Sequence, residues 1–309
     1  MLKRLGAGRI LWADGHSLFD NRALSDAYKL GIDRSNHVFE GLRAYEGSLF
    51  KPEAHIARLL ASARSLRLAC LYSAQDIQGA CEEVVAMPGM RNAYLLPVVW
   101  KGTSPVVSNC VDLSVRLAIT AWSWPQSFMA EPSPSAARLS LASWHTLMPR
   151  SVRGDVKCSD LLDHYAIPRL EARASGFDDA LLLDHRGLVT QTTRANIFFV
   201  CAGTLHTPKA ENFIDGITRQ TLIDIARREG IEVYERHILP GTLGYASEVF
   251  LTGTAIEVAP VEAIGDYKFP TVKMTALLRD SYKRLVQAGA PAQLQHTSKN
   301  RPLRQKAWL

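Results

Sequence analysis

The 309-residue chain is poor in cysteine and arranges its few cysteines without pattern. Cys70, Cys81, Cys110, Cys158 and Cys201 are scattered, no CxxC occurs, and no His/Cys pair has zinc-ligand spacing. Disulfide scaffolds and structural metal sites depend on such spacings. The sequence therefore predicts neither a disulfide framework nor a bound metal.

Long apolar runs are also missing. No window approaches the roughly 20 apolar residues that a membrane-spanning helix needs. The opening residues, MLKRLGAGRILWADG, contain no apolar core of the kind found in secretory signals. We expect a cytoplasmic protein that does not enter a membrane.

Charge of either sign is modest: 36 Lys and Arg stand against 30 Asp and Glu, for a formal net charge of +6. Much of the excess lies in the tail at residues 298–306, SKNRPLRQK. A nucleic-acid binder would carry its basic stripe within the folded body. Because 47% of residues are apolar and 21% are charged, a folded enzyme-like chain is expected, without a nucleic-acid partner.

Periodicity predicts mixed helix and strand, an α/β or α+β fold. Helices are expected at 52–66, 76–85, 159–174, 217–229 and 271–288, and strands at 9–14, 37–45, 48–51, 92–100, 111–122, 138–144, 179–184, 189–200, 231–238 and 248–252. The stretch SWPQSFMAEPSPSAA carries three prolines and cannot continue a strand. It divides the chain into a small domain (1–126), an interdomain loop (127–135), a large domain (136–289) and a basic tail (290–309).

Two turns and one arginine suit an anion such as phosphate. Gly216 and Thr218 open an amphipathic helix whose first N–H groups are free, and Thr252-Gly253-Thr254 ends a strand with two hydroxyls. Arg58 offers a planar donor fork. Each also has a purely structural interpretation: Gly216 and Thr218 as a helix cap, Gly253 as a strand-end turn, and Arg58 as a surface arginine.

Lys157, in DVKCSDLL, is the other candidate for chemistry. Most lysines are solvated surface charges, but an ε-amine among apolar neighbours loses its proton more readily and can form a Schiff base. The adjacent Cys158 has no His/Asn partner pattern, so a small packing residue is favoured there over a nucleophile.

Six segments, in this order, resemble the fold-type IV, or class IV, pyridoxal-phosphate aminotransferases. They are HVFEGLRAYEG, the HxxRL of 55–59, the DVK lysine, LVTQTTRANIFFV, GITR at 216–219 and EVFLTGTAIEVAPV at 248–261. The family includes branched-chain amino acid aminotransferases, D-amino acid aminotransferases and aminodeoxychorismate lyases. The resemblance covers about residues 8–285 and implies a two-domain fold with pyridoxal 5′-phosphate in the cleft.

The resemblance also implies residue roles. Lys157 would form the Schiff base and move the proton between substrate and cofactor. The residues implied in cofactor binding are Arg58, Lys157, Gln191, Asn196, Ile217, Thr218, Gly253 and Thr254. The substrate pocket would involve Arg34, Phe39, Arg43, Tyr94, Leu96, Thr254 and Ala255. The loop 102–110 would reach the site of a neighbouring subunit, because the family works as at least a dimer.

One departure from the family lies at Gln191. Relatives place a glutamate there, against the pyridine nitrogen, and its charge keeps that nitrogen protonated. A neutral amide donates or accepts but does not impose the proton. We expect the cofactor ring to be a weaker electron sink. Slow transamination, a specialised reaction and lost activity are then all open. The alternative is that Gln191 is a tolerated neutral replacement.

The predicted substrate pocket departs too. Leu96 stands where branched-chain enzymes have a carboxylate-binding arginine, and Tyr94, Leu96 and Val98 share one strand face, which is therefore apolar. Leu162 replaces a tyrosine, as in the D-amino acid branch. Arg34 replaces an aromatic residue, and our hypothesis is that Arg34, together with Arg43, recognises the anionic group instead.

Three functions are compatible with these residues. The leading one is transfer of an amino group between an amino acid and a 2-oxo acid, on a substrate other than leucine, isoleucine or valine. The second is a lyase of the aminodeoxychorismate type that uses the same cofactor. The third is a catalytically silent binding subunit, which the intact lysine and anion-site residues disfavour.

Overall fold

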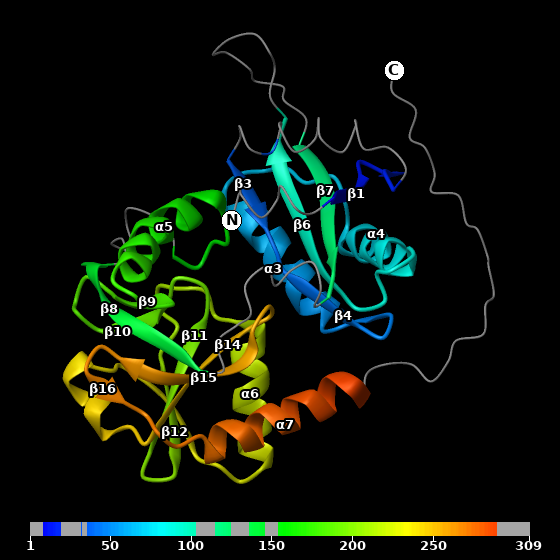
Figure 1. Cartoon of the computed structure of the whole chain (residues 1–309). Helices are drawn as coiled ribbons and strands as arrows, with labels where there is room; N and C mark the ends of the chain where they lie inside the picture. The colour runs from blue at the N-terminus through cyan, green and yellow to red at the C-terminus, as the bar shows by residue number, and fades with distance from the viewer. Residues whose placement is uncertain are drawn as a thin grey trace.

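The computed structural model describes residues 9–19, 32, 36–102, 115–124, 136–145 and 154–288. These form two sheets with helices packed on them, an N-terminal sheet and a larger C-terminal one (Figure 1). The predicted interdomain loop, most of the loop 102–110, Arg34 and the basic tail lie outside the described residues. Among the described helices, none is long and apolar enough to cross a bilayer.

The N-terminal sheet is antiparallel throughout, with the order β2-β1-β7-β6-β4-β5 and with β3 paired to β6. Its strands are β1 (Arg9–Ala13), β2 (His16–Ser17), β3 (His37–Phe39), β4 (Leu42–Tyr45), β5 (Ser48–Leu49), β6 (Ala93–Lys101) and β7 (Val115–Ser123). One face packs on α3 (Pro52–Ser65) and α4 (Ala74–Ala86). A Ser73–Asp76 capping box fixes the start of α4.

The C-terminal sheet mixes parallel and antiparallel pairs in the order β10-β9-β8-β15-β14-β11-β12-β13, with β16 on β15. Its strands are β8 (Ala137–His145), β9 (Asp179–Leu183), β10 (Val189–Thr192), β11 (Asn196–Cys201), β12 (Thr204–Pro208), β13 (Val233–Arg236), β14 (Glu248–Gly253), β15 (Glu257–Ile264) and β16 (Tyr267–Lys268). The short 3-10 helix η1 (Pro240–Tyr245) follows β13.

Side chains alternate along β11 and β14, so each strand contributes to two cores. Phe198 and Phe250 stack at 5.1 Å between centroids on the face covered by α6 (Ile217–Arg228) and α7 (Lys273–Ala288). Ile197 and Leu251 point into the second core, on the other face. The residues that follow on the α6 face, Asn196 and Thr252, are polar, and they lie where this face meets the N-terminal sheet.

The two sheets are joined directly in front of α5 (Ser159–Ala174). Val38 of β3 forms an antiparallel bridge with Cys158, and the Phe39 N–H donates to the Lys157 carbonyl at 3.1 Å. The backbone on either side of Lys157 is thereby fixed against the N-terminal sheet.

Two predicted strands are interrupted. The expected strand 189–200 is wrong as one element: β10 ends at Thr192, β11 begins at Asn196, and the Thr192 N–H turns back to the Ala195 carbonyl. The expected strand 37–45 divides into β3 and β4. The break lies opposite Pro97 of β6, which has no N–H to continue the ladder of hydrogen bonds. The sequence-based assignment also missed β12 and β15 as strands.

Candidate active site

Lys157 lies in the short segment between the two sheets, with its side chain only partly exposed. The Lys157 Nζ is 5.0 Å from the centroid of the Phe39 ring. The backbone N–H of Lys157 donates to the Ser62 Oγ at 3.2 Å. Burial lowers the pKa of the ε-amine; Glu40 opposes this shift and Arg58 adds to it. An amine held in this way is neutral more often than a surface lysine and can attack a carbonyl.

A buried carboxylate stands behind the site. Glu40 is fully buried in the break between β3 and β4, and it accepts from Arg58 Nε at 2.7 Å and Nη2 at 3.0 Å. His55 Nδ1 bonds the same carboxylate at 2.9 Å. Burial alone would raise the pKa of Glu40, but the Arg58 guanidinium and the His55 ring hold it well below its ordinary value.

Arg58 connects this carboxylate to the start of α6. Its Nη1 donates to the Asp215 carbonyl at 2.7 Å, one residue before the Gly216 N-cap. A guanidinium has five N–H donors. Three of them are used by Glu40 and Asp215, so within the described residues one on Nη1 and one on Nη2 remain for another acceptor.

The N-terminus of α6 supplies further donors. No side chain caps this helix, and the first-turn N–H groups, which include those of Ile217 and Thr218, have no intrahelical acceptor. The helix dipole favours an anion at the same place. Arg58 and this helix end, which the sequence predicts as separate anion-binding features, are brought together.

Asn196 orders the backbone beside that helix end. Its Oδ1 accepts from the Gly216 N–H at 3.1 Å, and its Nδ2 donates to the Ile214 carbonyl at 2.9 Å. A Cβ on Gly216 would overlap Asn196 Oδ1, so glycine is required here. Paired with Asn196 across the ladder is Thr252, whose fully buried hydroxyl has no partner in the described part of the chain.

A buried hydroxyl, the first N–H groups of a helix and two guanidinium donors, all without an acceptor or donor partner in the described part of the chain, suit a bound phosphate group. Together with the Lys157 amine, this donor set fits pyridoxal 5′-phosphate. Among the described residues, no cluster of His, Cys, Asp and Glu is arranged to hold a metal ion.

Gln191 is buried on β10, and its Oε1 accepts from Asn196 Nδ2 at 3.4 Å. Burial raises the pKa of Tyr165 to about 12, with Gln191 opposing the shift. Tyr165 therefore stays protonated, and no carboxylate occupies the position of Gln191.

The turn after β14 lies next to Asn196 and Thr252. Thr254 and Ala255 form its centre, and the Ile256 N–H closes it on the Gly253 carbonyl at 3.2 Å. Glu257 follows at φ 54°, a left-handed conformation that a non-glycine residue adopts only under local constraint.

Arg43 proves to be buried, with 3% of its side chain exposed. Its guanidinium lies between the Tyr45 and Trp124 rings, at 4.5 and 3.8 Å from the centroids, and Nη1 is 3.4 Å from Glu257 Oε1. The sequence-based hypothesis has Arg43 beside a substrate anion. In this arrangement its guanidinium forms an ion pair with Glu257, the one acidic partner of Arg43 among the described residues.

An apolar cluster of the N-terminal sheet includes Phe39, the ring next to the Lys157 amine. Phe39, Leu96, Val98 and Trp122 belong to one core cluster, against which Tyr94 and Leu162 are packed. The shared face predicted for β6 is confirmed by this cluster. A Cβ on Gly41 would overlap the Tyr94 hydroxyl, so this glycine lets the tyrosine lie flat on the chain.

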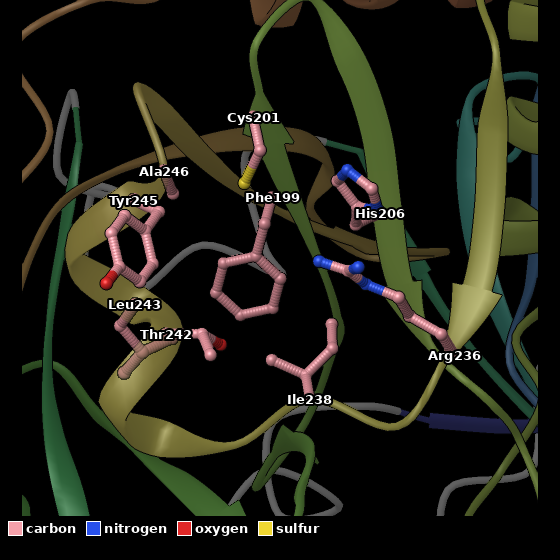
Figure 2. Close-up of a pocket in the computed structure, with 9 residues that line it drawn as sticks. All are labelled: Phe199, Cys201, His206, Arg236, Ile238, Thr242, Leu243, Tyr245 and Ala246. Atoms are coloured by element: carbon pink, nitrogen blue, oxygen red, sulfur yellow. The ribbon is translucent and has the colours of Figure 1, made fainter.

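A cavity of about 240 Å³ lies elsewhere (Figure 2). Phe199, which points away from the Asn196 face of β11, lines it together with Ile238 and Arg236 on one side and Leu243 and Tyr245 of η1 on the other. None of the predicted site residues lines this cavity.

Sequence patterns did not point to Glu40 and His55 as parts of the site. The signal was present, because the EG of HVFEGLRAY and the His of HxxRL occur within motifs that were recognised for other residues.

Comparison with known proteins places this geometry among aminotransferases. Residues 37–264 match the family model described as amino-transferase class IV. A probable branched-chain-amino-acid aminotransferase of Rickettsia typhi is 35% identical over 93% of this chain and 99% of its own length. A branched-chain-amino-acid aminotransferase of Pseudomonas aeruginosa is 28% identical over 90% of this chain and 92% of its own.

Solved structures agree. The branched-chain aminotransferase of Thermoproteus uzoniensis with norvaline superposes with a TM-score of 0.79 at 28% identity, over 91% of this chain and 96% of that one. The branched-chain amino acid aminotransferase of Thermobaculum terrenum in its PLP form gives 0.79 at 25% identity, over 91% and 95%.

Proposed function

Because the chain belongs to the class IV aminotransferases, enzymes that depend on pyridoxal 5′-phosphate, we propose that Lys157 is its catalytic residue and that it serves amino-group transfer between an amino acid and a 2-oxo acid. The observation that carries the proposal is the position of the Lys157 amine, with its lowered pKa, beside the anion-binding groups of Arg58 and α6.

Bound here, pyridoxal 5′-phosphate supplies an aldehyde that condenses with amines and a ring that withdraws electrons from the substrate carbon. Its phosphate group would be held by Arg58, the N–H groups of Ile217 and Thr218, and the residues Thr252 to Thr254. Neutral Lys157 Nζ accepts the proton of the substrate α-carbon and returns it later. Phe39, 5.0 Å from that Nζ, keeps water from the same side.

Gln191 supports a weaker electron sink than a carboxylate would provide. Its amide carries no charge, and its oxygen accepts from Asn196 Nδ2 at 3.4 Å. The proton on a nearby ring nitrogen is therefore not stabilised by an ion pair. The proposed consequence is slower proton removal from the substrate than in an enzyme with glutamate at this position.

For the substrate we propose an amino acid other than leucine, isoleucine or valine. The support is that Leu96, which stands where branched-chain enzymes have a carboxylate-binding arginine, belongs to an apolar cluster of the N-terminal sheet, whereas the relatives are named for branched-chain substrates. Thr254 and Ala255 would meet the substrate from the turn, and Arg34 would bind its anionic group. Replacing Arg34 with alanine should raise KM without changing cofactor absorbance, and an unchanged KM would eliminate this role.

Gln191 also favours a second candidate, a lyase of the aminodeoxychorismate type. The two reactions are distinguished by product. Pyruvate released from an amino donor without any added 2-oxo acid indicates elimination, whereas stoichiometric amination of the added 2-oxo acid indicates transfer. A Lys157→Ala variant should do neither, and activity in that variant would refute the proposal.

We further propose a cytoplasmic homodimer, in which the loop 102–110 of each subunit reaches its neighbour's site. Light scattering of the purified protein tests the assembly: a mass twice that of the 309-residue chain is expected, and a monomer with full activity would refute it.

A further inference from the structure

The segment that carries Lys157 lies against the segment that leads into α6. Gly154 is buried where the two segments meet, and it packs on the backbone of Asn212. A Cβ at Gly154 would lie 2.1 Å from the Asn212 carbonyl oxygen and 2.8 Å from the carbonyl carbon. Cβ atoms essentially never approach other atoms within 3.0 Å, so this contact requires glycine.

The lysine segment is anchored on its other side by the N-terminal sheet. Val156 and Cys158 are buried in the core that includes residues of α3 and α4. Lys157, between them, is held through its backbone. Its N–H donates to the Ser62 Oγ at 3.2 Å, and its carbonyl accepts from the Phe39 N–H at 3.1 Å. The glycine is therefore the point at which this segment rests on the chain that opens α6.

The segment that leads into α6 is anchored beside the proposed phosphate site. Asn196 bonds it twice, through Nδ2 to the Ile214 carbonyl at 2.9 Å and through Oδ1 to the Gly216 N–H at 3.1 Å. Arg58 Nη1 donates to the Asp215 carbonyl at 2.7 Å. The two halves of the proposed site, the amine and the helix end, thus meet directly through one backbone contact.

We infer that Gly154 is a positioning residue, whose close contact with Asn212 sets the spacing between the Lys157 amine and the start of α6. The inference rests on the proposed function, which assigns the cofactor aldehyde to the amine and the phosphate group to the helix end. Both groups of pyridoxal 5′-phosphate are carried by one aromatic ring, so the span between them is nearly fixed. The protein groups must match that span.

The size of the perturbation follows from the contact. In Gly154→Ala the two segments must separate by about 0.9 Å, the difference between 3.0 Å and 2.1 Å. Three side-chain hydrogen bonds hold the α6 side, so we expect the displacement on the Gly154 side, three residues before the lysine. A misplacement of about 1 Å can slow a reaction by about 100-fold.

The test compares two cofactor forms on the full-length protein freed of cofactor. Pyridoxal 5′-phosphate forms an imine with the lysine, whereas pyridoxamine 5′-phosphate has the same ring and phosphate group but no aldehyde. In Gly154→Ala we expect imine formation, followed by absorbance, to be about ten- to 100-fold slower than in wild type. The affinity for pyridoxamine 5′-phosphate should be unchanged, which also shows that the variant is folded.

Gly79→Ala is the matched control. Gly79 lies in α4, and a Cβ there meets no atom within 4 Å, so this variant should behave as wild type with both cofactor forms. A double variant separates positioning from other effects. In a Lys157→Ala background, Gly154→Ala should not weaken pyridoxal 5′-phosphate binding further, because no amine is left to misplace.

The outcomes are separable. If Gly154→Ala forms the imine at the wild-type rate, the inference is refuted and the proposed function stands. Equal weakening of both cofactor forms would mean that the contact shapes the phosphate end or the fold, and it would also refute the inference, as would a further loss in the double variant. If wild type itself forms no imine with pyridoxal 5′-phosphate, the proposed function falls.

Discussion

Replacing Glu40 with glutamine probes the buried charge behind the site. The substitution keeps the shape of the side chain but removes the charge that three donors share, two from Arg58 and one from His55. The carboxylate is fully buried, whereas the Arg58 side chain is 20% exposed. Arg58 therefore loses its ion partner in a place where water replaces it poorly.

Removing one member of a buried ion pair costs about 3–5 kcal/mol. Partial exposure of Arg58 puts the expectation at the lower end, about 3 kcal/mol of unfolding free energy at pH 7. By the usual conversion this lowers Tm by on the order of 5–10 °C. Glu83→Gln, an exposed change on α4, should stay within about 0.5 kcal/mol of wild type.

The difference in unfolding free energy between wild type and Glu40→Gln should become smaller as pH falls. The pKa of Glu40 is lowered in the folded state from its ordinary value of 4.5. The carboxylate therefore stabilises the fold fully above pH 4.5, and this contribution is lost as pH falls toward the folded pKa. Urea unfolding at pH 7 and at pH 4 checks both points. A Glu40→Gln variant as stable as Glu83→Gln at pH 7 would refute the reasoning.

Three further outcomes are expected. Gly216→Ala forces a methyl group onto Asn196 Oδ1, and by displacing the start of α6 it should weaken pyridoxal 5′-phosphate binding in a titration while the far-UV spectrum is unchanged. Gln191→Glu should speed proton removal from the amino donor in single-turnover kinetics, and an equal or lower rate would contradict the weaker electron sink. Gly41→Ala displaces the Tyr94 hydroxyl and should raise KM more than it lowers kcat; an unchanged KM would place Tyr94 outside the substrate pocket.

The sequence was most informative where one pattern dominates a segment. The helices at 52–66 and 159–174 were predicted within a residue or two, because their apolar spacing is regular and nothing nearby competes with it. The prediction of one strand over 189–200 failed, because the polar residues 191–196 between two apolar runs do not reveal to which groups their backbone hydrogen bonds go. The Thr192 N–H bonds the Ala195 carbonyl within the same segment, and this bond is visible only in the structure.

For the site, motif resemblance identified Lys157, Arg58 and the start of α6, and the structure brings these groups together. The supporting groups were less accessible to sequence reasoning. Glu40 looks like any acidic residue in a strand until the break opposite Pro97 shows that it is buried. His55, which bonds the same carboxylate, comes from α3, and only tertiary packing brings it to Glu40.

Location of the covalent cofactor attachment tests the central claim most directly. The protein is saturated with pyridoxal 5′-phosphate, reduced with borohydride, digested and mapped by mass spectrometry, with Lys157→Ala treated in parallel. We expect a single phosphopyridoxyl group on the peptide that contains Lys157, and none in the variant. A saturated protein with that lysine unmodified, or a label confined to another lysine, would contradict the account.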